Sequence, residues 1–89
     1  MGTSYKIIQT RFIRKGYSGF TLYPFIFVRD KSDKVLVNHE RIHWQQQKQL
    51  GLLRFLWMYF RDWYRFGYDN IPLEKEAKEN ERNMEYQVK

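Results

Sequence analysis

The sequence predicts an α+β domain in which a β-hairpin or small antiparallel sheet is followed by three helices. Three observations support this prediction. The first 30 residues are rich in β-branched and aromatic residues, which favour strands. From Lys34 onward, apolar residues recur at three- and four-residue steps, which is the period of a helix. Glycine and proline residues then divide this helical region into three parts.

The 89-residue chain is expected to form one small domain spanning residues 1–89. A domain of this size has a marginal core, and it often gains stability from a disulfide or a bound metal. Because the sequence contains no cysteine, disulfides and thiolate metal sites are both excluded. A metal would therefore have to bind to histidine and carboxylate side chains.

No segment of the sequence predicts secretion or insertion into a membrane. The N-terminus has no apolar run of the signal-peptide type. The longest apolar stretch, residues 50–60, is interrupted by Arg54 and is far shorter than the roughly 20 residues of a transmembrane helix. We therefore expect a cytoplasmic protein without a transmembrane segment.

Two strands are predicted in the N-terminal third of the chain. Residues 5–13 form the first strand, and residues 14–19, which include two glycines, form a turn. Residues 20–29 form the second strand, with Pro24 inside it. Because proline cannot donate to a β-ladder, this strand is expected at a sheet edge or with a bulge. Alternation places four apolar residues on one face: Phe20, Leu22, Ile26 and Val28.

Three helices are predicted after a polar break at residues 30–33. The first begins at Lys34 and ends or kinks at Gly51. The second covers residues 52–66, carries its three arginines on one side, and stops at Gly67. Pro72 opens the third helix, because proline is well tolerated in a first turn. The apolar stripe of this helix is predicted to consist of Leu73, Ala77 and Met84.

Residues 39–43 of the first predicted helix form an HExxH motif. His39 and His43, four residues apart, stand one above the other on a helix and can bind one Zn²⁺ through ring nitrogens. Glu40 points toward the open position of the metal, where it can take a proton from water. These are the only two histidines in the sequence. The alternative is a half-buried pair of histidines that is satisfied by hydrogen bonds.

The third ligand of such a metal has to be a carboxylate, because the sequence has no cysteine and no further histidine. The third predicted helix offers Glu74 and Glu76. These two flank its apolar stripe on opposite sides, so helix geometry alone does not choose between them. The remaining glutamates of this region are expected on a solvated face: Glu79, Glu81 and Glu85.

Two segments together resemble the small gluzincin-type zinc metallopeptidase domains: His39-Glu-Arg-Ile-His-Trp-Gln-Gln-Gln47 and Tyr68-Asp-Asn-Ile-Pro-Leu-Glu-Lys-Glu-Ala77. Such domains carry HExxHxxQQ on the active-site helix and an E-x-E-A or E-x-x-A-D segment on a later helix. The resemblance covers about residues 20–80. It implies a small zincin-like fold, a Zn²⁺ cofactor held by His39, His43 and Glu74, and Glu40 as the general base of peptide-bond hydrolysis.

The resemblance also implies roles for three further residues. Gln46 and Gln47 match the paired glutamines, which would support the ligand histidines from behind or pack the helix. Tyr68 matches a tyrosine before the E-x-E-A segment, which either stabilises an oxyanion or packs with its hydroxyl bonded. The chain departs from the pattern at Lys78, where related peptidases often have an aspartate that orients a ligand histidine.

Three functions remain open from these patterns. The first is a zinc metallopeptidase whose peptide or protein substrate pairs with the strand before the active-site helix. The second is a zinc-stabilised binding module without turnover. The third rests on the net charge of +6. An anionic membrane would suit the arginine side of the second predicted helix. A nucleic acid would suit the basic and aromatic residues near the N-terminus: Tyr5, Lys6, Arg11, Phe12, Arg14, Lys15 and Tyr17. Because basic residues usually form a solvated surface, we expect no nucleic-acid partner.

Overall fold

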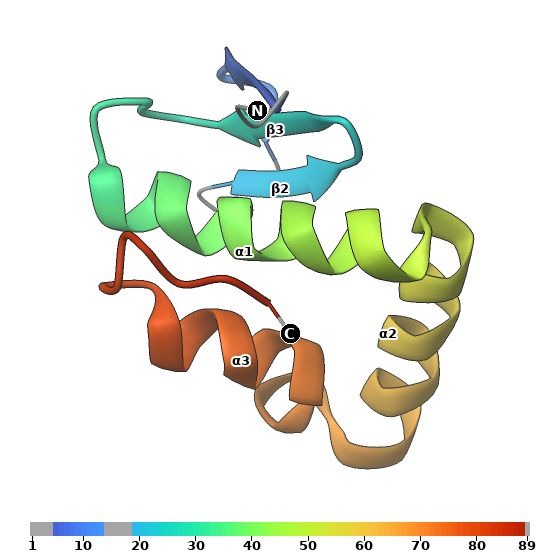
Figure 1. The fold of residues 1–89 in the computed structure, drawn as a ribbon. Helices are drawn as coiled ribbons and strands as arrows, with labels where there is room; N and C mark the ends of the chain where they lie inside the picture. The colour runs from blue at the N-terminus through green and yellow to red at the C-terminus, as the bar shows by residue number, and fades with distance from the viewer. Residues whose placement is uncertain (1–4, 14–18, 89) are drawn as a thin grey trace.

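The computed structural model describes residues 5–13 and 19–88 of the chain. The predicted α+β class is confirmed, because a sheet precedes the helices in the chain (Figure 1). The elements in chain order are β1 (Lys6–Gln9), β2 (Gly19–Leu22), β3 (Phe25–Val28), α1 (Lys34–Leu50), α2 (Leu52–Phe66), a 3₁₀ turn η1 (Tyr68–Asn70) and α3 (Pro72–Asn80).

The sheet is mixed, with the strand order β1-β3-β2. β3 is antiparallel to β2, with Phe27 opposite Phe20, and parallel to β1, with Ile26 opposite Ile7. The hairpin therefore joins β2 to β3, whereas the sequence predicted it between the regions of β1 and β2. Residues 14–18 of the predicted turn lie outside the described residues.

The predicted strand at residues 20–29 is two strands, β2 and β3, separated by Tyr23 and Pro24. A proline lacks the N–H that a ladder needs, so it fits a turn better than a strand interior. The sequence placed this proline inside one strand, at a sheet edge or with a bulge, and that prediction is wrong. Of these two strands, β2 lies at an edge of the sheet and β3 lies in its centre.

The core lies between the sheet and α1. Ile26 and Val28 share one face of β3, as predicted, and this face is fully buried; both cluster with the buried Trp44 of α1. The face predicted for β2 is wrong, because Thr21 is buried and the residues on either side of it are exposed. The chain reverses at Pro24, so the alternation of one strand does not continue into the next.

The helix boundaries follow the sequence prediction closely. At the start of α1 the Asp33 carboxylate accepts a hydrogen bond from the N–H of Leu36, at 3.1 Å. α1 ends at Gly51 and α2 ends at Gly67, where φ is 86° and 81°. Positive φ values of this kind favour glycine, because a Cβ atom would be strained there.

The helices are layered on one face of the sheet. α1 lies against the sheet, α3 lies beyond α1, and α2 descends from one end of α1 (Figure 1). α3 ends at Asn80, so Met84 lies beyond the helix and is exposed, and the predicted apolar stripe is wrong in this residue. Within the described residues, no helix is long and apolar enough to cross a membrane.

The segment that follows α3 returns along α1 and is held there by polar side chains of that helix. The amide nitrogen of Asn38 donates to the backbone oxygens of Glu81 and Asn83, at 2.7 and 2.9 Å. Arg41 and Gln45 both donate to the backbone oxygen of Tyr86. The chain beyond α3 is thereby fixed beside the first histidine of the motif.

Candidate metal centre

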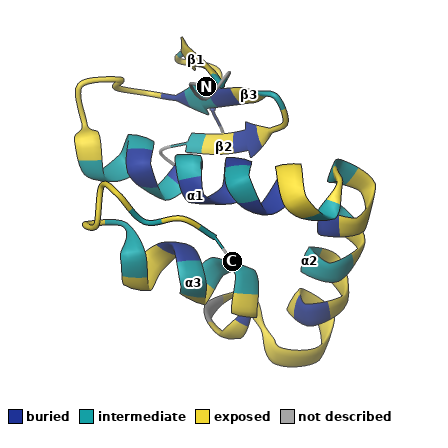
Figure 2. Cartoon of the chain, in the orientation of Figure 1, coloured by how far each residue is buried: buried dark blue, intermediate teal, exposed yellow. Residues whose placement is uncertain are grey.

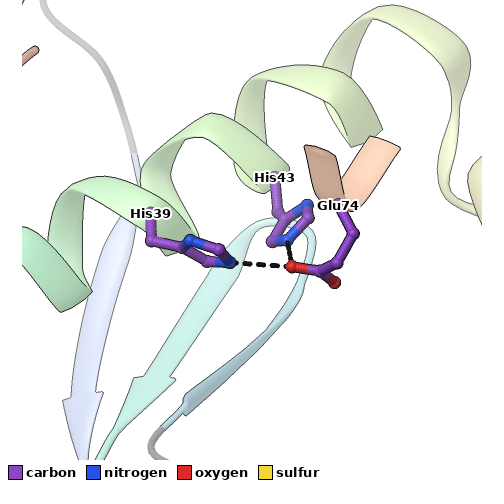
Figure 3. A group of neighbouring side chains, drawn as sticks. All are labelled: His39, His43 and Glu74. Atoms are coloured by element: carbon purple, nitrogen blue, oxygen red, sulfur yellow. Dashed lines mark hydrogen bonds and ion pairs between the residues drawn. The ribbon is translucent and has the colours of Figure 1, made fainter. Parts of the chain in front are cut away.

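The two histidines of α1 converge on one carboxylate of α3. The Nε2 atoms of His39 and His43 lie 2.8 and 3.1 Å from Oε1 of Glu74. Figure 3 shows both imidazoles pointing from the same side of α1 toward this carboxylate. Glu74 lies in the first turn of α3, where the Pro72 start and the helix dipole both suit an acidic residue.

These three side chains fit the donor set of a metal site. Their ligand atoms all lie within 4.8 Å of one another, and no other group of three histidine, aspartate or glutamate residues in the described part of the chain does so. A tetrahedral ion with bonds of 2.0–2.2 Å separates its ligand atoms by about 3.3–3.5 Å. A small outward movement of Glu74 would therefore admit an ion. Two imidazoles and a carboxylate suit Zn²⁺, which commonly keeps a fourth position open.

Gln46 holds the ring of His43 from behind. Its amide oxygen lies 2.8 Å from Nδ1 of His43, and its amide nitrogen donates to Glu76 and to the backbone oxygen of Leu73. Because both partners of the amide nitrogen are acceptors, the amide oxygen has to face the histidine. Nδ1 of His43 therefore carries a proton, which leaves Nε2 as the nitrogen that could bind a metal; without a metal, a protonated Nε2 donates to Glu74.

Glu81 contacts Nδ1 of His39 in the same way as Gln46 contacts Nδ1 of His43. Its Oε1 lies 2.9 Å from Nδ1 of His39, so the prediction of a solvated Glu81 is wrong. Lys78, which stands where the gluzincin pattern often has an acidic residue, is exposed. The sequence did hold a signal, since Glu81 follows Glu74 by seven residues, which is two helical turns on the same face. The hydrogen bond from Asn38 to the backbone oxygen of Glu81 could not be predicted from the sequence.

The structure places Glu74 and Glu76 on different sides of Gln46. Glu74 contacts both histidines, whereas Glu76 accepts hydrogen bonds from the Gln46 amide and the Tyr86 hydroxyl. Glu76, the alternative third ligand, therefore belongs to the support behind His43. Tyr86 was not among the predicted site residues, because nothing in the sequence indicates that the chain returns along α1.

Gln47 connects α1 to the sheet instead of to the histidines. Its amide oxygen accepts from the N–H of Tyr23 at 2.6 Å, and its amide nitrogen donates to the backbone oxygen of Thr21 at 2.8 Å. Two roles were predicted for the paired glutamines. Gln46 has the first, support of a candidate ligand histidine, and Gln47 has the second, packing of the helix. Adjacent residues of a helix point about 100° apart, which explains the division.

Glu40 is buried between α1 and β2. The hydroxyl of Thr21 donates to its carboxylate at 2.9 Å. Burial raises the pKa of Glu40, although the two histidines and the Thr21 bond act in the opposite direction. Gly19 packs so closely that a Cβ atom there would lie 3.3 Å from Cγ of Glu40 and 2.8 Å from the backbone oxygen of Phe27. A side chain at position 19 would therefore disturb this carboxylate.

A pocket of about 270 Å³ opens between β2 and α2 beside the histidines. Its polar wall includes His39, His43, Glu74 and Glu40, and its other walls are β2 and the apolar side chains of α2. A pocket that is mainly apolar and contains a few convergent polar groups is the usual form of a binding site. Tyr68 also lines the pocket and is partly exposed there.

Tyr59, which was not among the predicted site residues, donates a hydrogen bond to Glu74, the candidate third ligand. The hydroxyl of Tyr59 donates to Oε2 of Glu74 at 2.8 Å, and it also interacts with Tyr68. Burial, followed by the nearby Glu74, raises the pKa of Tyr59 far above its usual range. Tyr59 therefore stays a donor. Its place one turn after the buried Phe55, on the inner face of an amphipathic helix, was the signal that could have revealed it.

The electrostatics of the group favour protonated histidines when no metal neutralises Glu74. Burial acts against a charged imidazole, but the hydrogen bonds to Glu74 and Glu81 outweigh it and raise the pKa of His39 to about 9. The pKa of His43 is raised by Glu74 despite its deeper burial. Burial opposes the charge of Glu74 as well, yet the two histidines hold the pKa of its carboxyl well below its usual range.

No protein-family model, curated protein or solved structure matches this chain. The function is therefore argued from the site itself. Of the basic and aromatic residues near the N-terminus that suggested nucleic-acid binding, Arg14, Lys15 and Tyr17 lie outside the described residues.

Proposed function

We propose that the chain is a zinc-dependent metallopeptidase of the small gluzincin type, which hydrolyses peptide bonds in a peptide or protein. The observation that supports this most strongly is the approach of His39, His43 and Glu74 within 4.8 Å, from two helices that are far apart in the sequence. Behind this group, Gln46 and Glu81 bond the two Nδ1 atoms, so both Nε2 atoms are directed at one point.

Zn²⁺ at this point would supply a Lewis acid that polarises a peptide carbonyl and makes water more acidic. Glu40 then accepts the proton of the attacking water and passes it to the leaving amine. The raised pKa of Glu40 brings its carboxylate closer to the range in which one group can do both. Thr21 orients this carboxylate through its hydroxyl.

Tyr68 and Tyr59 stand on the opposite wall of the pocket from β2. Tyr59 keeps Glu74 in place by its hydrogen bond. Tyr68 is partly exposed at the pocket and interacts with Tyr59. We assign it the stabilisation of the oxyanion that forms when the carbonyl is attacked.

A peptide substrate would be held by strand addition along β2. This strand is an edge of the sheet, and its four residues line the pocket. Gln47 already bonds the backbone of Thr21 and Tyr23, so part of this edge is covered. We therefore place the substrate backbone near Gly19, beside Glu40. The exposed side chains of Phe20, Leu22 and Phe60 around the pocket favour apolar residues next to the cleaved bond.

The test compares Glu40→Gln with Glu79→Gln, which makes the same change at an exposed position of α3. Metal content and hydrolysis of a fluorogenic peptide library with apolar residues are measured for both variants and the wild type. We expect Glu40→Gln to keep its zinc and lose about 10²–10⁴-fold in rate, the usual contribution of a general base. We expect Glu79→Gln to match the wild type.

Three results would contradict the proposal. Turnover by Glu40→Gln at the wild-type rate would remove Glu40 from the reaction. A wild-type protein that binds zinc and cleaves no peptide of the library would favour the zinc-stabilised binding module. A protein that binds no zinc would exclude both.

A further inference from the structure

We propose that the outer face of α2 is a docking surface for an anionic membrane. Four large side chains at positions i, i+4, i+7 and i+11 form a continuous row, which we call the outer stripe. They span only about 60° of the helix circumference at 100° per residue. Their exposed fractions are 83% for Leu53, 65% for Trp57, 55% for Phe60 and 91% for Tyr64. Figure 2 shows how much more of α2 than of α1 is exposed.

An exposed apolar row of this kind requires a partner. Soluble domains rarely leave contiguous large apolar side chains exposed unless they bind something there. Tryptophan and tyrosine are the residues that favour the boundary between lipid headgroups and acyl chains. The outer stripe therefore has the composition of a helix that lies in the plane of a membrane interface.

The charge next to the outer stripe selects an anionic surface. Arg54, Arg61 and Arg65 form a second row about 90° around the helix from the stripe. The single acidic residue of α2, Asp62, is buried and pairs with Arg61 at 3.1 Å. Within α2, which the structure describes completely, no exposed carboxylate offsets these arginines. Lipid phosphates would neutralise them while the stripe enters the boundary region.

Other occupants use only part of this surface. A second copy of the chain would bury the stripe, but it would bring two arginine rows together with no exposed acid on either helix to pair with them. A nucleic acid would contact the arginines and leave Leu53 exposed to water. A membrane accepts both rows at once. α2 has 15 residues, so it would lie on the membrane and not span it.

Docking through the outer stripe would also orient the pocket. Phe60 belongs to the stripe and lines the pocket beside the histidines. The pocket would therefore open close to the lipid surface, where it could take substrates presented by the membrane. This consequence rests on the proposed function, whereas the docking itself requires no metal and no catalysis.

The experiment measures binding of the full chain to vesicles by co-sedimentation. One set of vesicles contains phosphatidylglycerol mixed with phosphatidylcholine, and the other contains phosphatidylcholine alone. We expect strong binding to the first set, weakened by added salt because the arginine contribution is screened. With brominated lipids, the emission of the exposed Trp57 should be quenched in a Trp63→Phe variant, which lacks the other exposed tryptophan of α2. Trp44, which is 2% exposed, should keep its emission.

Two pairs of variants separate the apolar and charged contributions. Trp57→Ser with Tyr64→Ser should reduce the affinity for anionic vesicles by roughly tenfold or more, because the apolar row is lost. Arg54→Gln with Arg65→Gln should reduce it by about fivefold for each charge removed. The matched controls are the exposed Phe12→Ser outside α2, and Lys31→Gln with Lys34→Gln near the start of α1. These controls should bind as the wild type does.

Several outcomes would overturn the proposal. They are no binding of the wild type to anionic vesicles, equal binding to both sets, or the same loss in the control variants. A wild-type dimer that Trp57→Ser dissociates, without affinity for vesicles, would assign the stripe to a second copy. Binding of a single-stranded oligonucleotide without affinity for vesicles would assign the arginines to nucleic acid. Because all the changed side chains are exposed, circular dichroism should report the wild-type fold throughout.

Discussion

The two sides of α1 are held by different kinds of contact. Toward the sheet, Trp44 packs with the fully buried Ile26 and Val28 in an apolar core. Toward α3 and the returning segment, Asn38 and Gln46 make hydrogen bonds to backbone oxygens and carboxylates. The sheet side gains its free energy mainly from apolar burial, with added hydrogen bonds from Trp44 and Gln47 to the backbone oxygens of Pro24 and Thr21. The polar side is stable only while every buried group keeps its partner.

This difference indicates how a very small domain can hold a polar site. The sheet side fixes α1 whether or not a metal is present. The polar contacts of the α3 side bring Glu74 to the histidines and add little net free energy, because each one replaces contacts with water. The fully buried Ile71 and Ala77 add apolar burial on this side. Zinc that binds only the folded state would add RT ln(1 + [L]/Kd) to the free energy of unfolding, and this gain would come through the α3 side.

The largest expected effect on stability comes from a substitution in the apolar core on the sheet side of α1. Ile26→Ala should lower the free energy of unfolding by about 2–5 kcal/mol, because it leaves a cavity in the core. The loss should be the same with zinc and with a strong chelator, since Ile26 lies on the sheet side of α1. Urea denaturation under both conditions measures it. Ile8→Ala, at an exposed position of β1, is the control and should cost under about 1 kcal/mol.

Substitution of the adjacent residues Gln46 and Gln47 should have an effect of intermediate size, and it compares the two sides of α1 directly. Gln46→Leu removes the acceptor of His43 Nδ1 and should weaken zinc binding by about 10–100-fold. Gln47→Leu leaves backbone groups of Thr21 and Tyr23 unpaired and should cost about 1–3 kcal/mol of stability, with zinc affinity unchanged. Zinc titration and urea denaturation of both variants check this. If both variants changed the same quantity, the division between the two sides of α1 would be wrong.

The most gradual expected effect is the dependence on pH, which is small for each pH unit. Because the pKa of His39 is raised to about 9 when no metal is bound, its ion pair with Glu74 stabilises the metal-free protein. This contribution is complete below the reference histidine pKa of about 6.5 and is lost as the pH rises through about 9. Zinc competes with the same proton, so zinc affinity should rise over this range, up to about tenfold per pH unit for each proton released.

With rising pH, the free energy of unfolding of the chelated protein should therefore fall, whereas the zinc affinity should rise. Urea denaturation of the chelated protein gives the first, and competition with a chromophoric chelator gives the second. Zinc affinity that stays constant between pH 6.5 and 9 would mean that no histidine proton is displaced.

The sequence predicted the features of the site that depend on local periodicity. The helical repeat from Lys34, the glycine stops and the i, i+4 spacing of His39 and His43 are properties of a single helix, and the structure has all of them. The proline start of α3 likewise placed Glu74 in a first turn. Such features require no knowledge of how the elements pack.

The features that the sequence did not predict are set by long-range contacts. The parallel pairing of β1 with β3 depends on the path of the chain between them. The contact of Glu81 with His39 depends on the hold of Asn38 on the end of α3. Tyr59 reaches Glu74 only because α2 descends beside α3. Helical periodicity could have placed Glu81 and Tyr59 on the inner faces of their helices, but it does not indicate which residues they contact.

The central claim is that Glu74 completes a zinc site with the two histidines and that Glu76 only supports it. Zinc titration by isothermal calorimetry, on the wild type and on the isosteric variants Glu74→Gln and Glu76→Gln, tests this claim most directly. We predict about one zinc ion per wild-type chain, as three protein ligands and one open position require. Glu74→Gln should bind zinc far more weakly, and Glu76→Gln should bind it with a smaller loss. Absence of zinc binding by the wild type, or binding that Glu76→Gln abolishes and Glu74→Gln leaves intact, would contradict the account.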